Sequence, residues 1–125
     1  NKLMVESKTS SSLGTKYTTR IEFSDVEFSE PSLNTISVEG VDSATYSFFP
    51  ISNRQNDVKL SCNCLDFYYR FSKYNEKDDS LYGGSPPPYI KKTNRPPVNP
   101  DKIPGMCKHL LRLSDQLLSI GVIKK

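Results

Sequence analysis

The stretch "VKLSCNCLDFYYRF", residues 58–71, decides the fold, and it contains two cysteines separated by one residue. A second stretch, "PGMCKHLLRL" at residues 104–113, contains a cysteine and a histidine at the same spacing. The chain has three cysteines and one histidine, so these two stretches hold all of them. The four residues are Cys62, Cys64, Cys107 and His109. Residues so rare in the chain, placed twice at the same spacing, indicate that the two pairs act together.

The four side chains match the ligand set of a structural zinc site. Zinc favours four tetrahedral ligands from thiolate sulfur and imidazole nitrogen, and three cysteines with one histidine form a common set. Alternate residues of a strand point to the same face, so Cys62 and Cys64, at the end of a predicted strand, can bind one ion. Cys107 and His109 lie where the chain enters a predicted helix. We therefore expect a Zn²⁺ ion that joins this strand to the helix and closes the long loop between them.

Other interpretations explain less of the pattern. Three buried cysteines and a core histidine would fit the composition, but they would leave the two matched pairs as a coincidence. A catalytic couple of Cys107 and His109 lacks a third orienting group, and an iron–sulfur cluster usually takes four cysteines. Because four protein ligands leave a zinc ion no open position, we expect no enzymatic activity.

Length and composition favour one small domain with a modest core. The chain has 125 residues, 35% of them hydrophobic, and its net charge of +3 permits a nucleic-acid contact without requiring one. An odd cysteine count without a signal-like apolar N-terminus argues against disulfides and favours a reducing compartment. No apolar run is long enough to span a membrane, so we expect no membrane partner. The chain begins at Asn1 without an initiator methionine, as expected of a processed product or part of a longer protein.

Periodic patterns predict a β-rich chain with one helix. In "KYTTRIEF", residues 16–23, apolar and polar residues alternate as in a half-buried strand. Similar runs predict strands at residues 35–40, 44–50 and 57–62. A segment at residues 106–120 predicts the helix, whose apolar stripe contains Leu110, Leu113, Leu117 and Ile120. The predicted fold class is α+β: a small β-rich domain with one C-terminal helix, stabilised by the structural zinc.

The aromatic run after the second cysteine, "LDFYYRFSKY" at residues 65–74, is predicted to be extended. In an extended segment Phe67, Tyr69 and Phe71 share one face, which we assign to the core rather than to base stacking. The alternation of aromatic and basic residues keeps nucleic-acid binding as the second hypothesis. We expect Asp66 to orient a metal ligand or to cap a turn.

Composition divides the chain into an arm and a domain. Residues 1–15 are polar and serine-rich, which predicts a flexible or docking N-terminal arm. Residues 16–125 form the predicted single zinc-stabilised domain, which contains a proline-rich loop at residues 76–105. Seven of the nine prolines lie between Pro86 and Pro104, so regular structure is not expected there.

The proline-rich loop has one structural and two binding interpretations. Proline lowers the entropy lost on immobilisation, so we favour a strap over the loop's own domain or over a neighbouring subunit. The sequence "PPPY", residues 86–89, also fits the PPxY ligand of WW domains. Four basic residues could contact a phosphate backbone, although nearby acidic residues dilute this charge: Lys91, Lys92, Arg95 and Lys102.

The pattern Cys-x-Cys … Cys-x-His followed by a leucine-rich helix resembles the SWIM-type zinc finger. This resemblance implies a module that binds DNA or protein, with Cys62, Cys64, Cys107 and His109 as the zinc ligands. The chain departs from the usual finger in the length between the pairs, because forty-two residues separate Cys64 from Cys107. The excess is the proline-rich loop.

The chain is also similar to small zinc-binding virion structural proteins of tailed phages. The stretches that carry this likeness are "CNCLDFYYRF", "YGGSPPPYIKKTNRPPVNP" and "PGMCKHLLRL", and they cover residues 60–120 while leaving the N-terminal half aside. The resemblance implies a structural component of a tail, neck or baseplate, assembled in the host cytoplasm and located in the virion. Its loop and arm would contact other structural subunits. The alternative is a cytoplasmic SWIM-like module that binds nucleic acid or protein.

Overall fold

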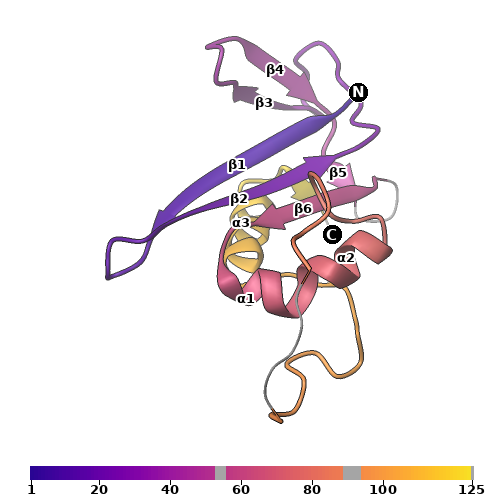
Figure 1. The fold of residues 1–125 in the computed structure, drawn as a ribbon. Helices are drawn as coiled ribbons and strands as arrows, with labels where there is room; N and C mark the ends of the chain where they lie inside the picture. Colours follow the sequence, from indigo (N-terminus) through magenta and orange to yellow (C-terminus); the bar gives the residue numbers. More distant parts are fainter. Residues whose placement is uncertain (53–55, 89–93, 125) are drawn as a thin grey trace.

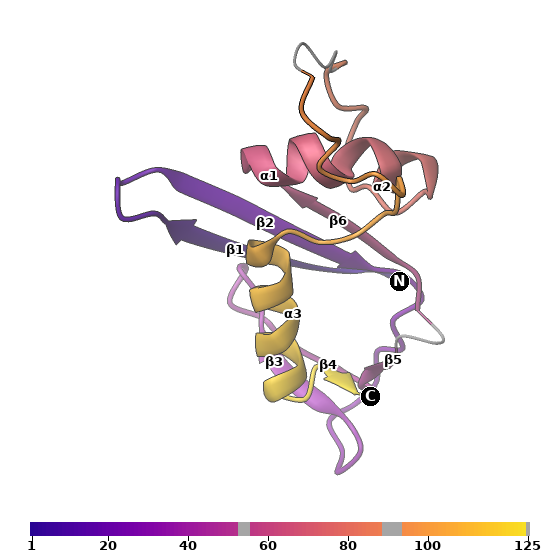
Figure 2. The same ribbon diagram turned by 90° about the horizontal axis from the view of Figure 1, so that it is seen from below.

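The computed structural model describes residues 1–52, 56–88 and 94–124, and these residues form a small α+β domain (Figure 1). A three-stranded antiparallel sheet has the order β1 (Leu3–Ser10), β2 (Lys16–Phe23) and β6 (Val58–Cys62). Helix α3 (Lys108–Ser119) packs against β2 and β6. Figure 2 shows that α3 and the helical segment that follows β6 flank the sheet from different sides.

Two smaller β-elements complete the domain. Strands β3 (Ile36–Glu39) and β4 (Thr45–Phe48) form an antiparallel hairpin beside the main sheet. Strand β5 (Ile51–Ser52) pairs in parallel with β7 (Ile123–Lys124), and this pairing brings the C-terminal end back to the middle of the chain. Within the three described ranges, no helix has both the length and the apolar character needed to cross a bilayer.

The core forms between α3 and the sheet, as the sequence pattern predicts. Ile21 and Phe23 of β2 are buried against Leu110, Leu113 and Leu117 of α3. The strand residues alternate and the helix residues share one stripe, so each element contributes a single apolar face.

Helix α3 ends at Ser119, one residue before the last position of the predicted stripe. Gly121 adopts a positive φ of 85°, and the amide of Val122 donates to the carbonyl of Leu117. This arrangement is a Schellman C-cap, which glycine favours because it has no Cβ to clash. Ile120 therefore lies beyond the helix and is 65% exposed rather than part of the buried stripe.

The prediction that residues 65–74 are extended is wrong. The segment forms α1 (Leu65–Phe67), a π-helical turn η1 (Tyr68–Ser72) and α2 (Lys73–Lys77) in direct succession. Phe67 and Asn75 are buried on the inner face, while Tyr69 is 44% exposed. The apparent alternation of aromatic residues misled the prediction, because the burial repeats with a helical and not a two-residue period.

Most of the N-terminal segment is extended and lies in the sheet. Residues 3–10 form β1, which pairs along its whole length with β2, for example Val5 with Ile21. Leu3 and Val5 are half-buried against the core, whereas Met4 faces solvent. In this polar, serine-rich stretch, only the alternate apolar residues Leu3 and Val5 indicate a strand. The neighbouring strand supplies the pairing that this segment's composition does not predict.

Hydrogen bonds hold the described part of the proline-rich loop on its own domain, beginning with the bridge of Leu81 to β6, where the amide of Tyr82 donates to the carbonyl of Leu60. The hydroxyl of Tyr68 donates to the carbonyl of Pro87 (2.7 Å), and the side chain of Asn99 donates to the carbonyl of Arg70 (2.8 Å). The buried side chain of Asn75 binds both the N–H and the C=O of Gly105. Residues 89–93, which include the tyrosine of "PPPY" and two lysines, lie outside the described residues.

Candidate metal centre

The structure brings the four predicted ligands together where β6, α1 and α3 meet. Cys62 ends β6, Cys64 is the N-cap of α1, Cys107 is the N-cap of α3, and His109 lies in the first turn of α3. The three sulfurs and the imidazole nitrogen all lie within 4.8 Å of one another. Nδ1 of His109 is 3.7 Å from Sγ of Cys62 and 4.0 Å from Sγ of Cys107.

These separations fit a tetrahedral metal ion. Metal–sulfur bonds of ~2.3 Å and metal–nitrogen bonds of ~2.0 Å place a sulfur and a nitrogen ligand ~3.5 Å apart at the tetrahedral angle. The two measured sulfur–nitrogen distances exceed this value by a few tenths of an ångström. A small inward movement of the side chains would give metal-binding geometry, so the cluster is close enough to hold an ion.

The site is closed by protein. The cysteines Cys62, Cys64 and Cys107 are 8%, 5% and 1% exposed. His109 is partly buried, and its ring stacks on the ring of Tyr17 with centroids 4.7 Å apart. Four protein ligands in a buried cluster satisfy a tetrahedral ion completely, which is typical of structural rather than catalytic sites.

The ionisation of the three thiols reflects their crowding. A hydrogen bond with Cys62, helped by backbone amides at the start of α3, lowers the pKa of Cys107 to about 5. The same hydrogen bond raises the pKa of Cys62, while burial raises the pKa of Cys64. Without a cation the shared hydrogen bond therefore favours ionisation of Cys107 over ionisation of Cys62. A bound cation would favour loss of the remaining thiol protons, because it neutralises the repulsion between the sulfurs.

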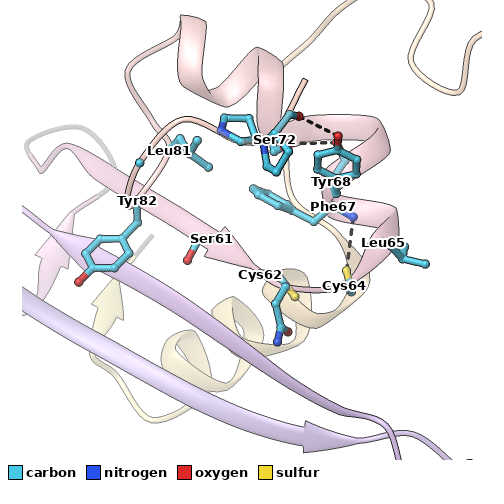
Figure 3. Close-up of a pocket in the computed structure, with 13 residues that line it drawn as sticks. Ser61, Cys62, Cys64, Leu65, Phe67, Tyr68, Ser72, Leu81 and Tyr82 are labelled. Carbon is cyan, nitrogen blue, oxygen red and sulfur yellow. Dashed lines mark hydrogen bonds between the residues drawn. The ribbon is translucent and has the colours of Figure 1, made fainter. Parts of the chain in front are cut away.

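Two backbone interactions hold the Cys-x-Cys turn in place. The amide of Phe67 donates to Sγ of Cys64 over 3.4 Å, so this sulfur caps α1 (Figure 3). Between the two cysteines, the side-chain oxygen of Asn63 accepts from the amide of Thr18 (2.8 Å), and the amide of Asn63 donates back to the carbonyl of Thr18. The turn is thereby fixed to β2, which contributes no ligand itself.

Sequence analysis missed Asn63 and Tyr17 as parts of the site. The position of Asn63 between the cysteines could have indicated its role, because a side-chain oxygen there can accept a hydrogen bond from a backbone amide of a neighbouring strand. Tyr17 carries no such signal, because only the packing of α3 on β2 places its ring against His109. Asp66, expected to orient a ligand or cap a turn, forms an ion pair with Arg70 at 3.3 Å.

A groove of about 400 Å³ lies beside the cysteine pair (Figure 3). One wall is the end of β6, the second is the start of the helical segment, and the third is the proline-rich loop. Its lining residues include Ser61, Leu65, Phe67, Leu81, Tyr82 and Pro86. Its described lining is mainly apolar.

Comparisons with known proteins give no match: no protein family, no curated protein and no solved structure resembles the chain closely enough to be assigned. The likenesses to the SWIM-type finger and to phage virion proteins therefore rest on the sequence motifs alone.

Proposed function

We propose that this chain is a non-enzymatic structural protein whose fold is fixed by one zinc ion. The observation that carries the proposal is the buried convergence of the four ligand atoms within 4.8 Å of one another. Thiolate and imidazole ligands in a tetrahedral arrangement favour zinc over magnesium or calcium, which prefer oxygen. The ligands are Cys62, Cys64, Cys107 and His109.

The ion would act as a cross-link between segments far apart in the sequence. It would join β6 and α1 to α3 and so close the forty-two residues between Cys64 and Cys107. Structural zinc contributes ~10–16 kcal/mol of apparent binding free energy, which exceeds the ~5–15 kcal/mol net stability of a typical domain. For a chain with 35% hydrophobic residues, such a contribution would decide whether the domain folds.

For the biological setting, we propose a component of a tailed-phage tail, neck or baseplate, in contact with other structural subunits. The support is the sequence resemblance around the two ligand pairs. The convergence of four protein ligands supports a structural role for the metal. A SWIM-like protein- or nucleic-acid-binding module is the alternative.

Metal content tests the zinc proposal directly. Elemental mass spectrometry of protein purified under mild reduction should find one zinc per chain in the unmutated protein and none in His109→Ala. Lys108→Ala is the matched control, because Lys108 is exposed and lies between two ligands. It should keep the metal and the circular dichroism spectrum. An unmutated protein without metal would overturn the proposal.

The virion proposal needs a separate measurement. Quantitative mass spectrometry of purified particles should find this chain at a fixed ratio to the other structural subunits. Absence from particles, with zinc still bound to the isolated protein, would leave the metal site standing and remove the virion role.

A further inference from the structure

The sheet has one open edge. Among the described residues, β1 pairs with β2 and with no other strand, while the opposite edge at β6 is partly covered by the bridge between Leu60 and Leu81. The β1 edge is eight residues long and borders the sheet in Figure 1. An edge of this length presents a row of backbone N–H and C=O groups to which another strand can pair.

The pairing pattern shows which residues of β1 offer those groups. Asn63 donates to the carbonyl of Thr18, and the amide of Ser24 donates to Asp57, so the even-numbered residues along β2 direct their backbone toward β6. Backbone direction alternates along a strand, so the odd residues of β2 face β1. Their partners are the odd residues of β1. The backbone groups that face outward therefore belong to Met4, Glu6, Lys8 and Ser10.

We propose that β1 pairs with β1 of a second copy of this chain, antiparallel and with the two-fold axis at Ser7. In this register Glu6 lies opposite Lys8 of the second copy, and the symmetry makes the same contact twice. Met4 lies opposite Ser10 of the second copy. The two three-stranded sheets become one continuous six-stranded sheet, and every outward backbone group from Met4 to Ser10 gains a partner.

Charge selects this register over its neighbours. An axis at Glu6 would place Glu6 opposite its own copy, and an axis at Lys8 would do the same for Lys8, so both registers oppose like charges. A shift of the register by one residue would place even-numbered residues, whose backbone groups point outward, opposite odd-numbered residues, whose backbone groups point toward β2. Such a shift would break the hydrogen-bond ladder. Of these registers, the axis at Ser7 opposes unlike charges and keeps the ladder.

A third charge extends the pattern across the sheet. Nε of Arg20 on β2 lies 3.0 Å from Oε2 of Glu6. Oε1 of the same Glu6 carboxylate lies 3.8 Å from Nζ of Lys8 of its own chain. In the paired sheet Glu6 would keep Arg20 and would share this lysine contact with Lys8 of the second copy, on the face away from α3. A lone lysine on an edge strand discourages pairing, whereas a glutamate and a lysine two residues apart complement a second copy. This inference goes beyond the zinc proposal and does not depend on it.

Charge reversal tests the dimer and its register together. Sedimentation velocity of the unmutated chain should show a dimer. Lys8→Glu and Glu6→Lys should each weaken self-association by roughly tenfold or more, because each opposes like charges at both contacts. When the two variants are mixed, both contacts oppose unlike charges, so a 1:1 heterodimer should form. Lys16→Glu changes an exposed charge on β2 away from the open edge and should leave the dimer intact.

Each outcome decides the inference. A monomeric unmutated chain at concentrations near 1 mM would overturn it, as would dimers that persist unchanged in Lys8→Glu or variants that fail to associate when mixed. Zinc content and circular dichroism, measured on the same samples, show whether a monomeric variant is folded. Failure of the metal site would appear in those readouts and not in the mixing experiment.

Discussion

The ring of Tyr17 stacks on the ring of His109, with centroids 4.7 Å apart and planes inclined by 30°. Nδ1 of the same imidazole lies near the sulfurs of Cys62 and Cys107. Tyr17 is on β2, which supplies no ligand, so a neighbouring strand fixes the orientation of the histidine that completes the cluster.

This contact predicts that Tyr17 tunes metal affinity. Tyr17→Ala should weaken zinc binding by about tenfold, because the imidazole loses its orienting neighbour while all four ligands remain. Tyr17→Phe keeps an aromatic ring and should bind as the unmutated protein does. Competition with a chromophoric chelator measures both affinities. Equal weakening in the two variants would show that the hydroxyl, and not the stacking, matters.

A close approach between Gly105 and Phe71 predicts a steric effect in the loop. A Cβ at Gly105 would lie 2.7 Å from Cε1 and 3.0 Å from Cδ1 of the Phe71 ring. Gly105→Ala should therefore lower the free energy of unfolding by ~1–3 kcal/mol. Gly84→Ala, where a Cβ meets nothing within 4 Å, is the control and should change it far less. Chemical denaturation of both variants gives the comparison, and equal effects would contradict the packing argument.

The buried amide of Asn75 predicts a larger loss. Its side chain is 0% exposed and binds both backbone groups of Gly105, at 2.8 and 3.0 Å. Asn75→Ala would leave two backbone groups without partners and should cost about 2 kcal/mol or more of unfolding free energy. Asn99 also bridges the loop to the helical segment, but its hydrogen bonds are exposed and water can replace them, so Asn99→Ala should cost less. Thermal denaturation that ranks Asn99 above Asn75 would contradict this order.

The β3–β4 turn predicts a pH dependence. The hydroxyl of Tyr46 donates to the carboxylate of Asp42, which lowers the pKa of Asp42 below 3.8 and raises the pKa of Tyr46 above 10.0. This hydrogen bond therefore stabilises the folded state fully between pH 3.8 and pH 10.0. It is lost as pH falls through the lowered Asp42 pKa or rises through the raised Tyr46 pKa.

Removing the hydroxyl of Tyr46 should return the pKa of the Asp42 carboxyl group toward its ordinary value. In Tyr46→Phe the pKa of Asp42 should rise toward 3.8, as measured by NMR titration of the side-chain carboxyl resonance. The amide of Ala44 still donates to the same carboxylate and should keep part of the shift. An unchanged Asp42 pKa in Tyr46→Phe would mean that the phenol does not hold the carboxylate in solution.

Much of the fold was predictable because its signals are local. The alternation in residues 16–23 and the leucine stripe beginning at Leu110 describe single faces of single elements, and both elements form where predicted. The helical segment 65–77 was not predicted, because its aromatic residues satisfy a two-residue and a four-residue period equally well. Burial of Phe67 and the cap from Cys64 decide between them.

The sequence by itself determined which atoms could bind a metal: three sulfurs and one imidazole, in two pairs at matched spacing. Only the tertiary structure decided what holds them, namely Tyr17 against His109, Asn63 against Thr18, and β1 as part of the sheet. Ligand chemistry is a property of single residues, so it can be read from the sequence without knowledge of the fold. The supporting contacts join positions distant in sequence, so they exist only after β2, β6 and α3 have packed together.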